Sequence, residues 1–341
     1  MTKQKSDPPV QRIDTINDDH HPLMNRFLIA AVMVLCSADA GAQNYPSKII
    51  RVINPAAPGG NSDIVFRLLA PKMGEILGQQ LVLDYRPGAG GVIGADITAK
   101  SPPDGYTLAI VAASFMFNPA LIKKLPYDSV NDFTPLGLVV DIPAAMAVHP
   151  SLPAHNLREF IALARTRPGQ IFFSSAGPGT LGHLAGELLN TQAKIKLVHV
   201  PYRGVAPATV DLIAGHVQMT IASIPVVIEH VRGGKLRMIA QCGEARSASL
   251  PDVPTMQQAG VPGFIVNSGF SLLGPAGMPR PIVEKLNSAL VKALHDQGVR
   301  KELIERGADP VGNTPEQHAA VIKAEIEKWQ RVARQAGIAP E

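Results

Sequence analysis

The sequence contains only two cysteines and one tryptophan in 341 residues. One of the cysteines, Cys36, falls in an N-terminal segment that we expect to be removed, so the mature chain would keep Cys242 alone. A single cysteine forms no intramolecular disulfide, even in a compartment that permits disulfides. The fold must therefore be held together by its apolar core.

Motifs typical of several enzyme and cofactor classes are also missing. There is no Walker A sequence, no G-x-S-x-G elbow, no H-E-x-x-H motif and no paired Cys/His spacing. The histidines are scattered; they include His20, His21, His149, His155, His199, His216 and His230. We therefore predict no metal, no cofactor and no enzymatic activity.

The net charge is only slightly positive, at +4. No cluster of Lys or Arg and no basic stripe interleaved with aromatic residues is present, so nucleic acid is not an expected partner. A weakly positive field would suit an anionic ligand.

Residues 27–36 form a short apolar run, FLIAAVMVLC, after Arg26. This run is too short to cross a bilayer, which needs roughly 18 or more residues. Followed by small residues, it is typical of a secretory signal peptide. We expect cleavage after Ala42, with Ala38-Asp-Ala40 as the competing site, and a periplasmic mature protein.

Residues 1–23 are polar and contain Asp and Pro, which is unusual for the start of a signal peptide. Translation therefore starts either at Met1 or at Met24. Lipid attachment at Cys36 is the less favoured alternative, because Leu35 stands where lipoprotein processing generally requires a small residue.

From residue 48 onward, short apolar β-branched runs alternate with helical stretches, which predicts an α/β fold with mostly parallel sheets. A proline-rich stretch at 143–153 precedes a second series of the same kind. Helices end the chain, the last opened by Thr314 with Gln317 at capping-box spacing. We predict a ligand cleft between two lobes, with residues 1–42 as N-terminal extension and signal peptide, 43–142 as the first part of lobe 1, 143–267 as lobe 2, and 268–341 as the return to lobe 1.

Three loops join a predicted strand to a predicted helix, which is where open α/β sheets bind ligands. In the first, residues 54–63, Gly59 and Gly60 allow close backbone approach, while Asn61 and Asp63 can cap the next helix. The unpaired N–H groups of a helix start favour an anion. We expect Asp63 to order the loop without contacting the anion. A tight turn with no ligand is the alternative.

The second loop, residues 174–184, contains the G-x-G-x-x-G pattern of dinucleotide-binding folds. That motif also needs an acidic residue at the end of the next strand, but this strand ends in Val200 and Pro201, so a nucleotide is not expected. Hydroxyl groups beside a helix start suit a carboxylate instead. The candidate residues are Ser174, Ser175, Gly179 and Thr180, with His183 as either a structural residue or a ligand contact.

The third loop, residues 200–212, carries small side chains that leave its backbone open to a ligand. Arg203 supplies a positive charge to the ligand or is simply solvated; both interpretations stay open. The other candidate residues are Gly204, Ala206, Pro207, Ala208 and Asp211.

Several sequence blocks occur together and in order along the chain. They are YPSKIIRVINPAAPGGNSDIVFRLLA, YRPGAGGVIGA, PPDGYTL, LPYDSVNDFTPLGLV, SSAGPGTLGHLAGELL, VPYRGVAPATVDLIAG and GPAGMPRPIVEKLN. With these blocks the chain resembles the Bug-type solute receptors of tripartite tricarboxylate transporter systems over essentially its whole mature length.

This resemblance implies a periplasmic-binding-protein-like (type 2) architecture and a monomeric receptor without a cofactor. The receptor would close on a small carboxylate and pass it to membrane permease subunits. The loops from Ala57 to Asp63 and from Arg203 to Ala208 would pinch the ligand carboxyl group, largely through backbone N–H groups and ordered water. Ser114 and the loop at 174–180 would complete the pocket.

The chain departs from the family pattern at Pro178, Val205, Gln218 and Gly269, where members often carry a polar residue, Ser, Asp and Trp respectively. These changes leave the identity of the carboxylate open, and they indicate a less polar pocket for an aromatic or branched acid. A secreted enzyme and a ligand sensor acting on a signalling partner remain the alternative functions.

Overall fold

The computed structural model describes residues 45–56, 58–247 and 249–340. The predicted signal peptide, both start sites, Cys36 and Ala57 lie outside these residues. Over the part of the chain that is described, no helix combines the length and the apolar character that crossing a membrane requires.

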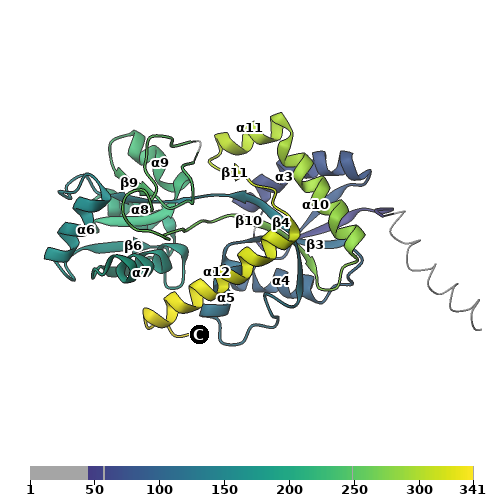
Figure 1. The fold of residues 1–341 in the computed structure, drawn as a ribbon, viewed down its shortest axis with the longest axis horizontal. Helices are drawn as coiled ribbons and strands as arrows, with labels where there is room; N and C mark the ends of the chain where they lie inside the picture. Colours follow the sequence, from purple (N-terminus) through teal and green to yellow (C-terminus); the bar gives the residue numbers. More distant parts are fainter. Residues whose placement is uncertain (1–44, 57, 248, 341) are drawn as a thin grey trace, which may run out of the picture. The chain divides into compact units, whose positions relative to one another are not determined.

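One group of elements surrounds a six-stranded sheet of order β11-β4-β10-β3-β1-β2 (Figure 1). Its strands are β1 (Ile50–Asn54), β2 (Leu81–Tyr85), β3 (Thr107–Ala112), β4 (Phe133–Asp141), β10 (Phe270–Pro275) and β11 (Asp309–Pro310). Its helices are α3 (Asn61–Leu77), the 3-10 turn η1 (Ala89–Gly91), α4 (Val92–Ala99), α5 (Ser114–Leu121), α10 (Arg280–His295) and α11 (Gln297–Glu305). We call this group the first lobe.

The second lobe is built on a five-stranded sheet of order β7-β6-β8-β5-β9. Its strands are β5 (Ala144–Val148), β6 (Phe172–Ser175), β7 (Val198–Pro201), β8 (Met219–Ser223) and β9 (Arg237–Gln241). Its helices are α6 (Leu157–Thr166), α7 (Leu181–Ala193), α8 (Val205–Ile213) and α9 (Ile224–Arg232). The predicted two-lobed α/β fold is therefore confirmed.

The sheets are mixed, so the prediction of mostly parallel sheets is wrong. β1 pairs in parallel with β2 and β3, and β6 with β7 and β8, as βαβ order requires. In contrast, β10 runs antiparallel to β3 and β4, and β5 antiparallel to β8 and β9. These two strands enter their sheets directly from the other lobe, without a helical crossover to reverse the chain.

Helix ends agree with their sequence signals. Gly78 ends α3 in a left-handed conformation, with φ 75°. The Asn156 side chain accepts a hydrogen bond from the Glu159 N–H and starts α6. The capping box of Thr314 and Gln317 starts the last helix, α12 (Pro315–Gln335).

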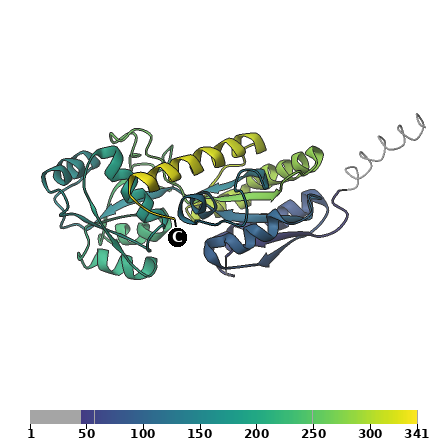
Figure 2. The same ribbon diagram turned by 90° about the horizontal axis from the view of Figure 1, so that it is seen from below.

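Helix α12 contacts both lobes (Figures 1 and 2). It packs on α5 and β4 of the first lobe and on α7 of the second. Its Trp329 is fully buried and meets the Phe117 ring edge to face, with centroids 4.9 Å apart, so this side chain packs in the core. The Lys328 ammonium donates to the Ile265 carbonyl at 3.0 Å.

Candidate functional site

Three adjoining cavities lie where strands of both sheets end. The central cavity, about 570 Å³, is lined from both lobes. The first-lobe chamber, about 290 Å³, shares Gly90, Ser114 and Asn118 with it. The second-lobe chamber, about 160 Å³, shares Thr180 and Ser223 with it. Cavities of such total size are typical of small-molecule sites.

Within the described part of the chain, no Asp, Glu, Lys, Arg or His side chain lines any of the three cavities. The polar side chains around the central cavity are all neutral: Asn61, Ser114, Asn118, Thr180, Ser223 and Ser268. Among these residues no acid or base is placed to transfer a proton to a bound molecule. An anion there would be held by neutral donors alone.

Helix α4 begins after Gly91 at the first-lobe chamber and has no side-chain cap. Of the other described helices, five begin at the central cavity or the second-lobe chamber: α3, α5, α7, α8 and α9. Their N-cap residues are Gly60, Ala113, Thr180, Gly204 and Ser223, and none accepts a first-turn N–H through its side chain. Of the helices that begin elsewhere, α6, α11 and α12 are capped by side chains, whereas α10 is not. In α9 the Ile224 N–H donates to the Pro143 carbonyl at 3.1 Å and Pro225 has no N–H. The other uncapped first turns keep N–H donors, and the positive end of the helix dipole, for a ligand.

The first glycine loop is tied down by Asp63, which is 3% exposed. Its carboxylate accepts hydrogen bonds from the Gly59 N–H at 2.7 Å, Arg67 Nε at 2.6 Å and the Tyr85 hydroxyl at 2.8 Å. Burial raises the pKa of Asp63, but these hydrogen bonds outweigh it and hold the pKa below its ordinary value. Asp63 thus restrains the loop and lines none of the three cavities.

The third loop has an analogous restraint in the second lobe. The Tyr202 hydroxyl donates to Asp211 Oδ2 at 2.6 Å, and His216 Nδ1 lies 3.3 Å from Asp211 Oδ1. Burial and the Asp211 carboxylate raise the pKa of Tyr202 to about 12. The Gly204 N–H donates to the Ala176 carbonyl at 3.1 Å, which joins the second and third loops.

In the second loop most side-chain groups bond to the loop itself. The Thr180 hydroxyl donates to the Gly177 carbonyl at 2.7 Å, and the Gly179 N–H donates to His183 Nδ1 at 3.0 Å. The His183 ring stacks on His199 at a centroid distance of 3.9 Å, and burial lowers its pKa. In this structure the His183 ring thus bonds to its own loop and lines none of the three cavities.

A contact between Ser175 Oγ and His199 Nε2, at 2.6 Å, has the form of a nucleophile and a base. Burial, followed by the neighbouring His183, lowers the pKa of His199 to about 4. No carboxylate of the described residues hydrogen-bonds to the His199 ring. The Ser175 hydroxyl is also engaged with Gly177, so this pair lacks the orienting third group of a catalytic triad.

The structure distributes the predicted site residues unevenly. Those that line a cavity are Asn61, Ser114, Ser175, Gly179, Thr180 and Ala208. Those that line none of the three are Gly59, Gly60, Asp63, Ser174, His183, Arg203, Gly204, Ala206, Pro207 and Asp211. Arg203 is exposed, without a hydrogen bond or ion pair to any described residue, and Ser174 is fully buried.

Sequence reasoning missed several lining residues. Asn118 lies one helical turn after Ser114, and Ser223 ends strand β8, so the same spacing and strand-end arguments could have found both. Ser268 lies on the crossover to β10, with no local signal. Its hydroxyl is 2.7 Å from that of Ser223.

The structure shows the surroundings of two residues at which the chain departs from the family pattern. A Cβ at Gly269 would lie 2.4 Å from the Val140 carbonyl oxygen, so no larger residue fits there without movement of the backbone. Val205 is 47% exposed and lines the second-lobe chamber, where it presents an apolar side chain.

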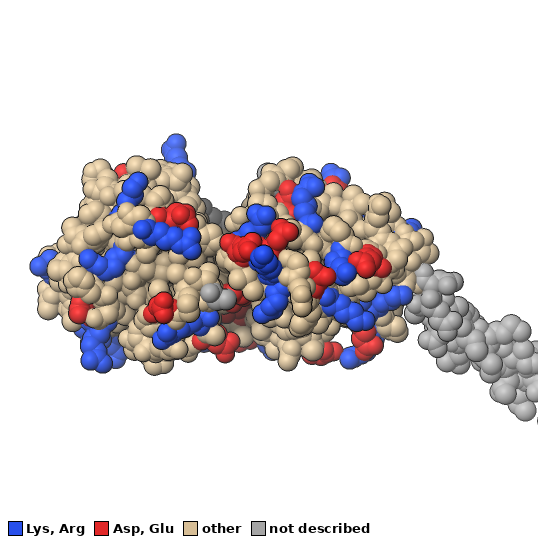
Figure 3. Space-filling model, turned by 90° about the horizontal axis from the view of Figure 1, so that it is seen from above, with Lys and Arg blue, Asp and Glu red and all other residues tan. Residues whose placement is uncertain are grey.

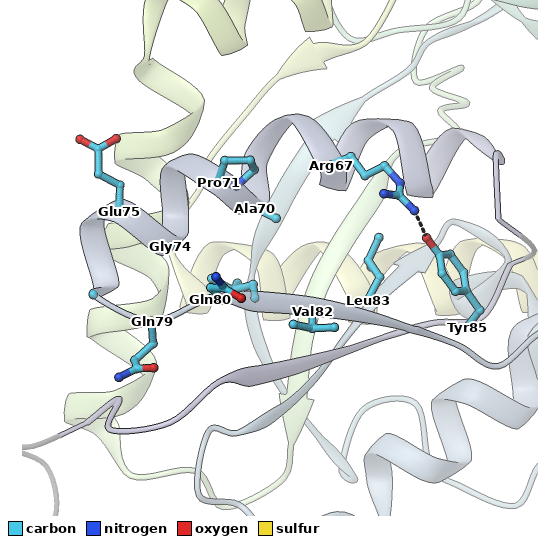
Figure 4. Close-up of a pocket in the computed structure, with 12 residues that line it drawn as sticks. Arg67, Ala70, Pro71, Gly74, Glu75, Gln79, Gln80, Val82, Leu83 and Tyr85 are labelled. Atoms are coloured by element: carbon cyan, nitrogen blue, oxygen red, sulfur yellow. Dashed lines mark hydrogen bonds between the residues drawn. The ribbon is translucent and has the colours of Figure 1, made fainter.

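A larger cavity of about 890 Å³ lies between α3 and β2 (Figure 4). Its lining includes Arg67 and Tyr85, whose hydrogen bond of 2.6 Å belongs to the Asp63 restraint. None of the predicted site residues that the structure describes lines it, and none of the described helices begins there. Volume alone does not make it the functional site.

Charged side chains of both signs are interspersed on the face shown in Figure 3, without a large area of one sign. Two α/β lobes with a cavity lined by neutral donors between them suit a protein that holds a small molecule between its lobes. Residues 65–338 match the family model described as "Tripartite tricarboxylate transporter family receptor". The chain belongs to this family of solute-binding receptors.

Relatives and solved structures agree with this assignment. Protein BugT of Bordetella pertussis is 37% identical over 322 residues, which cover 92% of this chain and 99% of that protein. R. palustris Rpa4515 with adipate is 35% identical, covers 87% of this chain and 100% of its own, and has a TM-score of 0.71. MatC of Rhodopseudomonas palustris with bound malate is 33% identical, covers 84% and 99%, and has a TM-score of 0.67.

Proposed function

We propose that this protein is a periplasmic receptor that captures a small carboxylate between its two lobes, delivers it to the permease of a tripartite tricarboxylate-type transporter, and does not transform it. The observation that carries the proposal is the convergence of five uncapped helix starts on cavities that no ionisable side chain of the described residues lines, apart from the Tyr127 phenol of the first-lobe chamber. Carboxylates suit such sites because backbone N–H groups donate to them without a formal ion pair.

Two relatives support the ligand class. The structures similar to this chain include one with adipate and one with bound malate, both carboxylates. The predicted signal peptide supports export, and we expect the mature receptor to act as a monomer. Closure of the lobes would couple to capture because the ligand binds more tightly to the closed state.

The test is a thermal-shift and calorimetric screen of residues 43–341 against mono-, di- and tricarboxylates. A ligand that binds only the folded state raises its apparent stability, so we expect at least one carboxylate to raise the melting temperature. The matching amides serve as uncharged controls. If the amides bind as well as the acids, or if no acid binds, carboxylate capture is wrong.

The same samples test the absence of catalysis. Each ligand that binds is recovered after incubation and analysed by mass spectrometry. We expect it unchanged. Turnover that disappears in Ser175→Ala or His199→Gln would show that the contact between these side chains is catalytic and would refute the receptor assignment.

A further inference from the structure

Besides its neutral hydrogen-bond donors, the central cavity has a wall of large apolar side chains. Seven large apolar side chains form it: Phe117, Leu121, Ile122, Ile142, Leu181, Phe270 and Ile338. They come from α5 and its end, from the crossover into β5, from the start of α7, from β10 and from the segment after α12. A fully polar ligand such as a hydroxylated tricarboxylate would leave its hydroxyl and carboxylate groups against this wall without partners.

Helix α5 carries both polar and apolar lining residues. Ser114, Phe117 and Asn118 line the cavity from its first two turns, and Leu121 and Ile122, both apolar, line it from its end. Leu121 lies seven positions after Ser114, a rise of roughly 10 Å at 1.5 Å per residue. This distance fits a carboxylate at one end and a hydrocarbon body of about five or more carbons along the helix.

Two of the apolar residues, Leu121 and Ile338, line the cavity next to other parts of the chain. A Cβ placed on Gly179 of the second lobe would lie 3.0 Å from Leu121 Cδ1, so Leu121 reaches across to the second glycine loop. Ile338 follows α12, is held by a 2.9 Å hydrogen bond from its N–H to the Ala333 carbonyl, and packs against the same core cluster as Leu121. The C-terminal segment is therefore part of the cavity wall.

We infer that the ligand is a carboxylate with an apolar body, aliphatic or aromatic, of about five or more carbons, and that Leu121 and Ile338 set this preference. The inference rests on the proposed carboxylate-binding function. It narrows the expected ligands to those whose part beyond the carboxyl group can contact apolar side chains.

The first experiment is calorimetry with acetate, butyrate, hexanoate, benzoate, malate and citrate. Each buried methylene group should tighten binding about fourfold, so affinity should rise steadily from acetate to hexanoate, and benzoate should bind more tightly than acetate. Malate or citrate binding more tightly than hexanoate and benzoate would overturn this inference and leave carboxylate capture intact. No binding by any acid would overturn both.

The second experiment uses Leu121→Ala and Ile338→Ala, with Ile49→Ala as the matched control. Ile49 is 57% exposed and lines none of the three cavities. Each cavity variant should weaken hexanoate or benzoate about tenfold and acetate less than about twofold, and the control should change neither. The ratio between long and short acids separates ligand contact from general loss of stability. An unchanged ratio in both cavity variants would refute the assigned roles.

Discussion

Replacing Asp63 by Asn perturbs the restraint on the first glycine loop with almost no change in size. The carboxylate accepts from Gly59, Arg67 and Tyr85, and one Asn oxygen cannot replace both carboxylate oxygens. Hydrogen bonds to a charged group are worth about 1.5–3 kcal/mol each. The Arg67 side chain is 63% exposed, so we assign its ion pair nothing.

The remaining two hydrogen bonds lie near the surface, where solvent screening weakens them, so we expect a loss of about 2–3 kcal/mol in the free energy of unfolding. That corresponds to a fall of roughly 5–10 °C in the melting temperature. Urea unfolding followed by circular dichroism measures the loss. Asp252→Asn, on an exposed residue without a hydrogen bond or ion pair to the described residues, is the matched control.

The pH dependence gives a sharper test of the same restraint. The pKa of Asp63 is lowered on folding, so its stabilisation is fully present above the ordinary pKa of 3.8 and is lost as the pH falls through the lower folded pKa. The stability gap between wild type and Asp63→Asn should stay constant from about pH 8 to pH 5 and close below about pH 4. A gap of less than about 0.5 kcal/mol at pH 7, or one that persists unchanged in acid, would refute this account.

Three further predictions concern other parts of the chain. Gly59→Val should weaken carboxylate binding at least about fivefold. Gly234→Val, also at positive φ with open space around it, should cost similar stability without affecting binding. If the two variants bind the carboxylate with equal affinity, the first loop is not part of the site. Trp329→Ala should lower the free energy of unfolding by about 3–5 kcal/mol, because the indole is fully buried against Phe117; a loss below about 1 kcal/mol in urea would contradict that packing. Burial lowers the pKa of His318 to about 4. Below about pH 6.5 the unfolded chain therefore gains a proton that the folded chain does not, and the free energy of unfolding falls. His318→Leu should remove about 2 kcal/mol of this loss at pH 5. An identical pH profile in His318→Leu would show that this histidine does not cause the acid sensitivity.

Local patterns in the sequence predicted most helices and strands. The glycine after α3 and the caps of α6 and α12 act through neighbouring backbone groups, so their effect is readable within a few residues. The three glycine loops follow from the same βα alternation. Their position at strand ends predicted Asn61, Thr180 and Ala208 as residues near one site before any packing was known.

Only the tertiary structure decided how the two sheets are completed and what surrounds the cavity. β5 and β10 lie antiparallel to their neighbours because each arrives from the other lobe, a relation between segments far apart in sequence. Ser268 and Ile338 reach the cavity for the same reason. The sequence by itself determined where backbone donors are available, because helix starts are local. Which side chains face those donors depends on long-range packing, and that packing lines part of the central cavity with apolar side chains.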